Sequence, residues 1–154
     1  RRMPQAHLAI VGWDHGFLNR AKQITTELRL SDRVFFLEPL FGSERLSAYV
    51  DADVFALTPC VYEETSLSAL EACACGTGCV VTKQCEIPGL DENTAGLTVD
   101  YNLEQVANAL WQSLQQGFAE QSGANARRFV QERFTITAVA KEHERFFADV
   151  ANAK

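Results

Sequence analysis

Short apolar runs alternate with amphipathic stretches through the first hundred residues of the chain. Apolar runs of three or four residues that end near Gly or Pro are typical of strands buried in a sheet. Spacings of three and four between apolar residues favour helices in the stretches between them. The pattern predicts strands over residues 8–11, 34–37, 54–57, 79–81 and 97–99, and helices over 17–30, 43–51 and 66–75.

The pattern changes near Leu103, where helical spacing begins and continues almost to the end of the chain. It predicts helices over residues 103–114, 123–134 and 135–150. Strands separated by helices indicate βαβ crossovers, and therefore an α/β, Rossmann-like fold in which a parallel sheet carries helices on both faces. Ligands of such sheets bind beyond the carboxyl ends of the strands. Here those ends are the loops that begin at Gly12, Glu38, Pro59 and Thr82.

The composition narrows the classes of function. A chain of 154 residues, 47% hydrophobic and 22% charged, is typical of one soluble globular domain. Fourteen Lys and Arg against twenty Asp and Glu give a net charge of −6, which disfavours nucleic acid and anionic lipid as partners. The apolar runs are far shorter than the roughly 20 residues that span a bilayer. We therefore expect a cytoplasmic domain.

The five cysteines do not show the spacing of a metal site. Cys73 and Cys75 are two positions apart and form no C-x2-C pair, and the three histidines are scattered along the chain. The spacing favours free, buried thiols in a reducing compartment over a metal site. We expect no bound metal.

The loop after the third predicted strand leads into a candidate phosphate site. The next helix is predicted to begin near Thr65 or Ser66, whose hydroxyl groups suit an N-cap. The first backbone amides of that helix, at Ser66, Leu67 and Ser68, point toward the strand ends. Together with the helix dipole, they are suited to bind a phosphate or diphosphate group.

Two glutamates flank this predicted helix start. Glu71, inside the helix, is placed to accept hydrogen bonds from a ribose diol, and Glu63, in the loop, to lie nearer the far end of a diphosphate ligand. The alternative is that the helix dipole alone favours Glu71 and that Glu63 belongs to a solvated loop. The chain has neither G-x-G-x-x-G nor G-x4-G-K-[ST], which argues against a standard NAD site and excludes a P-loop.

These residues also carry a resemblance to a known family. Glu63 and Glu71 enclose seven residues, and residues 70–76, Leu-Glu-Ala-Cys-Ala-Cys-Gly, are similar to a Leu-Glu-Ala-Met-Ala-x-Gly segment. The chain thus resembles the retaining GT-B-fold glycosyltransferases of group 1, or family 4, whose motif is E-x7-E. The segments 8–12, 32–37, 52–59 and 126–134 resemble other parts of the family in the same order, so the resemblance covers nearly all of residues 7–150.

The resemblance implies a role for each matching residue. Glu63 would be the catalytic glutamate that contacts the transferred sugar, and Glu71 would bind the ribose of the nucleotide. Further donor contacts would come from a glycine-bearing loop and from backbone amides at the helix start. These positions are Gly12, Thr65, Ser66 and Leu67.

The resemblance also implies an activity and its partners. The intact enzyme would move a hexose from a nucleoside diphosphate sugar to an acceptor hydroxyl with retention of configuration, without a metal or cofactor. Residues 1–154 would be the donor-binding domain, truncated at its first strand and helix and therefore without the family's Gly-Arg turn and Lys. The partner would be an absent N-terminal acceptor domain, and any association with the inner face of the membrane would come from absent parts. We expect residues 1–154 alone to be inactive.

The sequence departs from the family pattern around the expected sugar pocket. Glu64-Thr65-Ser66 stands where the family usually has Gly-Phe-Gly, and Gly78 replaces the usual Pro. The sugar, the nucleotide and the acceptor therefore stay open. Two other interpretations also stay open: a non-catalytic nucleotide-binding module, and another enzyme on the same scaffold, such as a sugar-nucleotide epimerase or a phosphorylase.

Overall fold

The computed structural model describes residues 3–63, 66–115 and 117–153. The chain divides into two compact units, Arg1–Leu46 and Ser47–Lys154. Parallel strands alternate with helices in both, so the predicted α/β fold class is confirmed. The sequence predicted a single sheet, whereas the described strands form two parallel sheets, one in each unit. No described ladder joins β2 to β3, since β1 pairs with β2 and β3 pairs with β4.

The first unit contains strand β1 (Leu8–Val11), helix α1 (Leu18–Glu27) and strand β2 (Val34–Leu37). Leu8 of β1 lies opposite Val34 of β2 in a parallel ladder. Both strands have the predicted bounds, but β1 is not buried: the exposed fractions of Leu8, Ile10 and Val11 are 50%, 43% and 44%. The reason is that parallel strands are fully buried only where helices cover both faces of a wider sheet.

The loop between β1 and α1 is organised by one carboxylate. Asp14 Oδ1 accepts hydrogen bonds from the backbone amides of Gly16 and Leu18, at 2.7 and 3.1 Å. These amide donors lower the pKa of Asp14, because they favour its charged form. Asp14 thereby satisfies the amide of Leu18, the first residue of α1, which has no partner within the helix.

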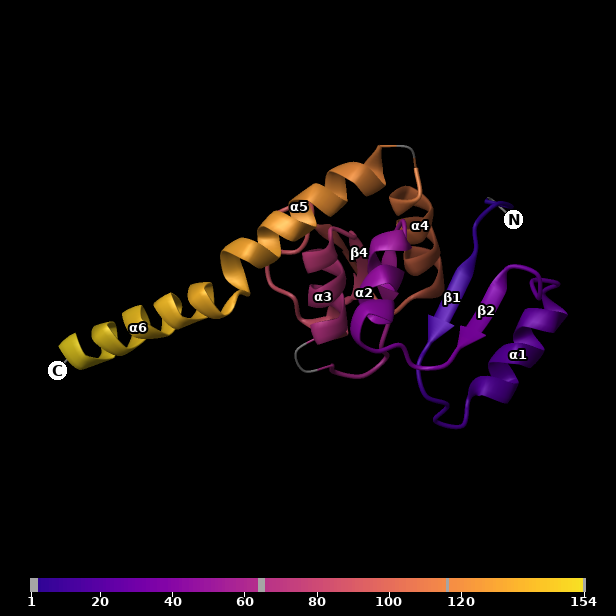
Figure 1. Cartoon of the computed structure of the whole chain (residues 1–154), viewed down its shortest axis with the longest axis horizontal. Coiled ribbons are helices and arrows are strands. Elements are labelled where there is room, and N and C mark those ends of the chain that lie inside the picture. The colour runs from indigo at the N-terminus through magenta and orange to yellow at the C-terminus, as the bar shows by residue number, and fades with distance from the viewer. Residues whose placement is uncertain (1–2, 64–65, 116, 154) are drawn as a thin grey trace. The chain divides into compact units, whose positions relative to one another are not determined.

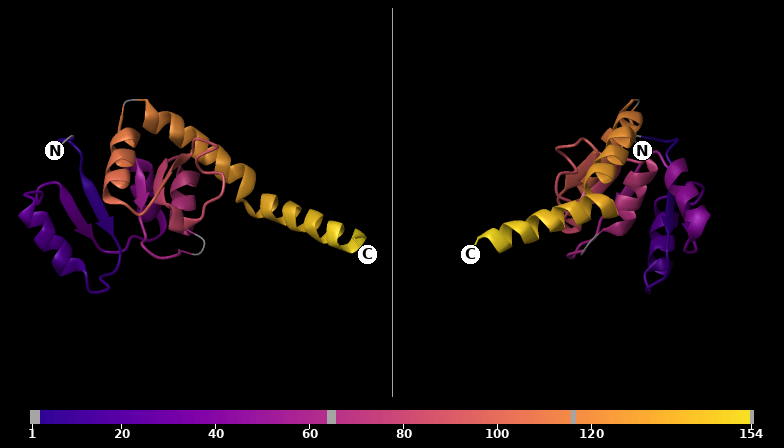
Figure 2. Two further views of the ribbon diagram at one scale, coloured as in Figure 1. Left: turned by 180° about the vertical axis from the view of Figure 1, so that it is seen from behind. Right: turned by 60° about the vertical axis from the view of Figure 1, so that its left-hand side comes forward.

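The second unit begins within helix α2 (Gly42–Asp51), which crosses the boundary between the units. Its sheet contains the strands β3 (Phe55–Leu57), β4 (Cys79–Thr82) and β5 (Gly96–Val99), in that order and all parallel. Helix α3 (Leu67–Cys75) contacts β3 and β4, and helix α4 (Leu103–Ser113) contacts β4 and β5. Figures 1 and 2 show this sheet between α3 and α4, so the predicted helices on both faces are confirmed here.

The core of the second unit lies between β4, α3 and helix α5 (Phe118–Arg133). All four residues of β4 are buried. The face of α3 toward the core consists of small residues, which allows a close approach to the sheet. Its fully buried residues are Ala69, Ala72 and Cys73.

Helix α5 packs against the end of α3. Gly76, with φ at +88°, ends α3 in the left-handed conformation that glycine adopts without strain. A side chain at Gly123 of α5 would collide with the carbonyl oxygen of Gly76. The guanidinium group of Arg127 donates hydrogen bonds to the carbonyls of Ala74 and Cys75, at 3.3 and 2.9 Å, which complements the negative end of the helix dipole. These contacts hold α3 at its carboxyl end.

Candidate functional site

The loop after β3 is tied to the loop after β4. Thr82, fully buried at the end of β4, donates a hydrogen bond from its hydroxyl to the carbonyl of Pro59, at 2.9 Å. The backbone amide of Glu63 donates to the carbonyl of Gln84, also at 2.9 Å. Gln84 lies in the 3-10 helix η1 (Lys83–Cys85) that directly follows β4. These bonds place Glu63, whose side chain is exposed, beyond the carboxyl ends of two parallel strands, where ligands of α/β sheets bind.

The start of α3 lies against the same loop. Ser66 is 2% exposed, and its hydroxyl donates a hydrogen bond to the carbonyl of Cys85, at 3.2 Å. It makes no cap bond to the helix, so the prediction that the Ser66 hydroxyl caps α3 is wrong, because the nearby buried carbonyl takes that donor instead. The other predicted cap, Thr65, lies outside the described residues.

The backbone amides of the first turn of α3 remain candidates for an anion. Leu67 and Ser68 are the first two helical residues, and their amides have no acceptor within the helix because of their position. The side chain of Leu67 is 64% exposed, so its role in a site would rest on its amide. A helix N-terminus of this kind favours a phosphate through its dipole and its N–H groups.

Glu71 lies one turn further along α3 and is held by a side-chain hydrogen bond. Its Oε2 atom accepts a hydrogen bond from the hydroxyl of Tyr49 in α2, at 3.2 Å. Both residues are partly buried. Glu63 and Glu71 thus lie on the loop and the helix that follow β3, and Glu63 is exposed whereas the carboxylate of Glu71 is hydrogen-bonded.

Gly12 belongs to the other unit. It follows β1 with φ at +148°, and its amide donates a hydrogen bond to the carbonyl of Leu37, at 3.2 Å. This places Gly12 at the carboxyl end of β1, as the sequence predicts. The structure does not test its place beside the residues of α3.

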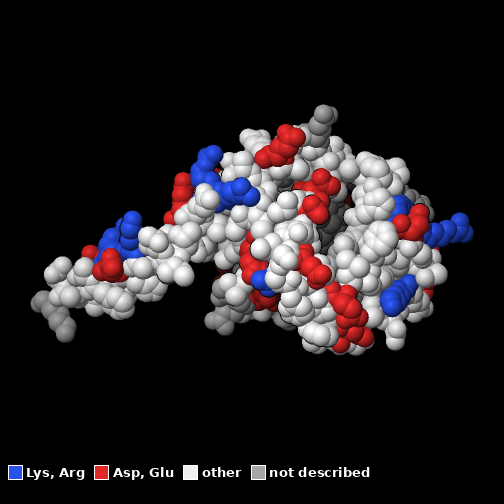
Figure 3. Space-filling model, in the orientation of Figure 1, with Lys and Arg blue, Asp and Glu red and all other residues white. Residues whose placement is uncertain are grey.

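The charges around the second unit are mainly acidic. Figure 3 shows acidic side chains spread over the face of the molecule that it presents. Near the end of β4, Lys83 forms an ion pair with Asp100, at 2.6 Å between Nζ and Oδ1. The hydrogen bond from Lys83 lowers the pKa of Asp100, and a second one from Gln105 acts in the same direction. Lys83 therefore already has a carboxylate as its partner.

The buried cysteines form part of the core. All five cysteines are unpaired, and the Sγ atoms of Cys73 and Cys79 are 3.3 Å apart. The hydrogen bond with Cys73, together with burial, raises the pKa of the Cys79 thiol well above its ordinary value. Within residues 3–63, 66–115 and 117–153, no group of three or more His, Cys, Asp or Glu side chains is placed to hold a metal ion. Nor is any described helix both long and apolar enough to cross a membrane.

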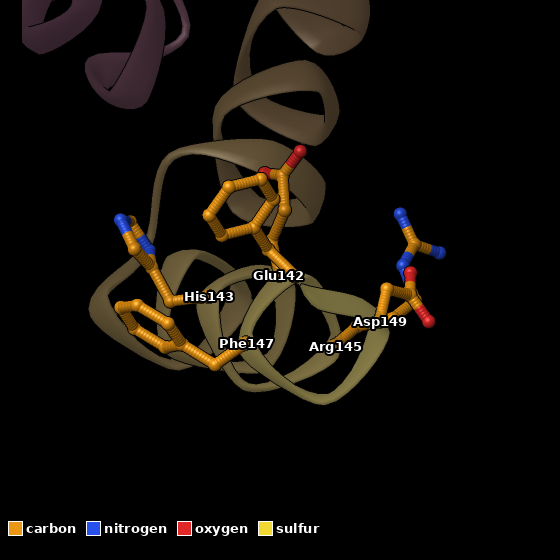
Figure 4. Close-up of a pocket in the computed structure, with 6 residues that line it drawn as sticks. Glu142, His143, Arg145, Phe147 and Asp149 are labelled. Carbon is orange, nitrogen blue, oxygen red and sulfur yellow. The ribbon is translucent and has the colours of Figure 1, made fainter. Parts of the chain in front are cut away.

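A hollow of about 440 Å³ lies on helix α6 (Ile136–Asn152). Figure 4 shows His143 and Phe147 on one side of the helix and Arg145 and Asp149 on another, so these side chains do not converge on a ligand. All the lining residues come from α6, which extends away from α3 in Figure 1. The hollow is therefore separate from the site around Glu71.

Sequence reasoning missed Tyr49 as part of this site. Tyr49 lies within the helix predicted over residues 43–51, and nothing in the local pattern assigned it a role. The signal that was available is chemical: a tyrosine on an apolar face carries a hydroxyl group that needs a partner when it is buried. The sequence could not name that partner, because Glu71 is 22 residues away along the chain.

The parallel strands and alternating helices form a Rossmann-like α/β domain of the GT-B type. A family model described as "Glycosyl transferases group 1" matches residues 1–116. The chain therefore belongs to the group 1 glycosyltransferases, which confirms the resemblance seen in the sequence.

Curated relatives agree with this assignment. The chain is 38% identical over 106 residues to a D-inositol 3-phosphate glycosyltransferase of Corynebacterium jeikeium, covering 64% of this chain and 25% of that protein. It is 30% identical over 131 residues to the protein of the same name from Mycolicibacterium smegmatis, covering 82% of this chain and 30% of that protein. The chain thus spans less than a third of the length of these relatives.

Solved structures share the fold. Sucrose-phosphate synthase from Thermosynechococcus elongatus superposes with a TM-score of 0.74 at 29% identity, covering 99% of this chain and 40% of that one. The HepE protein of Anabaena, solved in complex with UDP, superposes with a TM-score of 0.74 at 20% identity, covering 95% of this chain and 42% of that one.

Proposed function

We propose that this chain is the donor-binding domain of a retaining glycosyltransferase that transfers a hexose from a nucleoside diphosphate sugar to an acceptor hydroxyl group. The observation that carries the proposal is the arrangement of Glu63 and Glu71 around the start of α3, beyond the carboxyl ends of β3 and β4. Family membership supports the reaction class.

The nucleotide would lie along α3. Glu71 accepts hydrogen bonds from the ribose hydroxyl groups, because an ionised carboxylate can accept several hydrogen bonds at once. The amides of Leu67 and Ser68 bind the diphosphate at the positive end of the helix dipole. As charge develops on the departing diphosphate, these fixed donors stabilise it without a bound metal.

The sugar would lie at the loop end of the site. Glu63 contacts the transferred hexose, because it is exposed and anchored through its amide to Gln84 beside the strand ends. In the reaction, the bond between the anomeric carbon and the diphosphate breaks, a bond to the acceptor oxygen forms on the same face, and the proton of the acceptor hydroxyl group passes to the departing diphosphate. The identity of the hexose depends on the loop that carries Glu63.

The acceptor would be chosen by another part of the protein. The chain covers 25–30% of the length of its curated relatives, so the acceptor domain is the proposed partner of this one. We expect residues 1–154 alone to give no measurable glycosyl transfer, and turnover by these residues with a nucleotide sugar and a simple acceptor would contradict this division of roles.

Titration calorimetry on the full polypeptide that the gene encodes tests the proposal. UDP and UDP-glucose are suitable first probes, because HepE was solved with UDP and with UDP and glucose. Hydrogen bonds to a charged group contribute about 1.5–3 kcal/mol each. Glu71→Ala should therefore weaken UDP binding at least about tenfold, and Glu71→Gln, which keeps the shape and one acceptor, should weaken it less.

Two other variants complete the design. Glu63→Ala should leave UDP affinity nearly unchanged but reduce sugar transfer. Glu144→Ala is the matched control, because Glu144 is exposed on α6, which extends away from α3. If Glu71→Ala folds and binds UDP as tightly as the parent, the ribose role of Glu71 is wrong. Binding of UDP without transfer to any acceptor would instead favour the non-catalytic nucleotide-binding module.

A further inference from the structure

Tyr49 joins two helices at the carboxylate proposed to bind ribose. Its hydroxyl group, in α2, donates a hydrogen bond to Glu71 Oε2, in α3, at 3.2 Å. Figure 1 shows these two helices next to each other. An ionised carboxylate has about four acceptor positions, so it can hold the hydroxyl group of Tyr49 and hydroxyl groups of a ligand together.

Tyr49 is itself held from two sides. Its backbone carbonyl accepts a hydrogen bond from the hydroxyl of Thr77, at 2.5 Å, just after the end of α3. Its ring meets the ring of Phe55, the first residue of β3, edge to face with centroids 5.6 Å apart and an interplanar angle of 78°. The backbone and the ring of Tyr49 are therefore both held, and together they direct its hydroxyl group toward Glu71.

We propose that Tyr49 is a positioning residue that holds the carboxylate of Glu71 in the orientation that accepts the ribose hydroxyl groups of the nucleotide. This inference rests on the proposed function. A free glutamate side chain loses much of its rotamer freedom when it binds a ligand, and that loss weakens binding. Tyr49 restricts the carboxylate before the nucleotide arrives, so less freedom is lost on binding.

A positioning role for Tyr49 and a purely structural contact between α2 and α3 predict different effects on ligand affinity. A structural contact would affect stability and every ligand of the site equally. A positioning role affects only ligands that have ribose hydroxyl groups, because these are the groups that Glu71 would bind. The natural comparison is between a nucleoside diphosphate and its 2′,3′-dideoxy form.

The test measures the affinity of the full encoded polypeptide for UDP, ADP and GDP, and for the 2′,3′-dideoxy form of whichever binds most tightly. Tyr49→Phe keeps the ring and its contact with Phe55 but removes the hydroxyl group. It should weaken binding of the ribonucleotide about two- to tenfold and leave binding of the dideoxy form unchanged. Tyr101→Phe, at an exposed tyrosine on the loop after β5, is the matched control and should change neither.

A double-mutant cycle separates this inference from the proposed function. In a Glu71→Ala background there is no carboxylate to orient, so adding Tyr49→Phe should cost little further affinity. If Glu71→Ala loses the preference for the ribonucleotide while Tyr49→Phe keeps it in full, the positioning role is wrong and the ribose role of Glu71 stands. If Glu71→Ala also keeps the preference, or if none of the three nucleotides binds, the proposed function fails and this inference fails with it.

Discussion

Replacing Ser66 by alanine tests how the start of α3 is held. The hydroxyl of Ser66, 2% exposed, donates to the carbonyl of Cys85 and makes no cap bond to the helix. Ser66→Ala therefore removes a bond between the helix and the loop after β4, and leaves the carbonyl of Cys85 without that donor. The amides proposed to bind the diphosphate lie directly after Ser66, so the same change should disturb the site.

The size of the effect follows from the burial of the pair. Leaving a buried acceptor without its donor costs about 1–3 kcal/mol, which is a substantial part of the 5–15 kcal/mol that stabilises a typical domain. For a chain of this length, such a loss corresponds to a fall of about 2–12 °C in Tm. Ser47→Ala, at an exposed position of α2, is the control and should change the free energy of unfolding by no more than about 0.5 kcal/mol.

A second substitution distinguishes the observed bond from a helix cap. Asparagine and aspartate are as good as serine at N-cap positions. If Ser66 acted as a cap, Ser66→Asp would be tolerated. The structure predicts the reverse, because an acidic acceptor would face the carbonyl of Cys85 in a buried place, and Ser66→Asp should be less stable than Ser66→Ala. Thermal unfolding together with amide hydrogen exchange in α3 measures this order, and an aspartate variant as stable as the parent would refute the reasoning.

Two further predictions concern ionisation. Because Lys83 lowers the pKa of Asp100, their ion pair stabilises the fold above the pKa that Asp100 has in the unfolded chain, and this contribution is lost as the pH falls through the folded-state pKa. An NMR titration should place the midpoint of Asp100 below the ordinary 3.8, and Lys83→Met should raise it; a midpoint unaffected by that substitution would contradict the assignment. Among the thiols, exposed Cys60 should react with iodoacetamide well before buried Cys79, whose pKa is raised, and equal rates measured by peptide mass spectrometry would show that the core around Cys79 opens readily.

The sequence predicted a helix or strand best where a local pattern, such as an apolar run or a glycine, determines its bounds. The apolar runs at 8–11 and 34–37 are the observed strands, and the end of α3 falls where Gly76 predicts it. The start of α5 was predicted at residue 123, whereas the helix begins at Phe118. A glycine often marks the end of a helix. Gly123 instead lies inside α5, because its lack of a side chain lets the helix approach the carbonyl of Gly76. That reason is tertiary and is invisible in the local pattern.

In the candidate site, too, the local features were predicted from the sequence and the long-range contacts were not. The spacing of Glu63 and Glu71 is local and was found from the sequence. The partners of Ser66 and Tyr49 are 19 and 22 residues away along the chain, so they depend on how the loop after β4 and helix α2 meet α3. A hydroxyl group that is buried needs a hydrogen-bond partner, and for both residues only the fold identifies that partner. For Ser66 this changed a predicted cap into a bond between loop and helix.

The small buried residues of α3 limit which substitutions this domain can accept during evolution. Ala69, Ala72 and Cys73 are completely buried, so larger residues there would push the helix away from β4 and move Glu71 with it. The loop after β3 has no such restriction at its exposed positions, and it carries Glu63. Mutations that persist through evolution should therefore accumulate on the loop and spare the helix. On the proposed function, new sugar preferences would arise while recognition of the nucleotide is inherited unchanged.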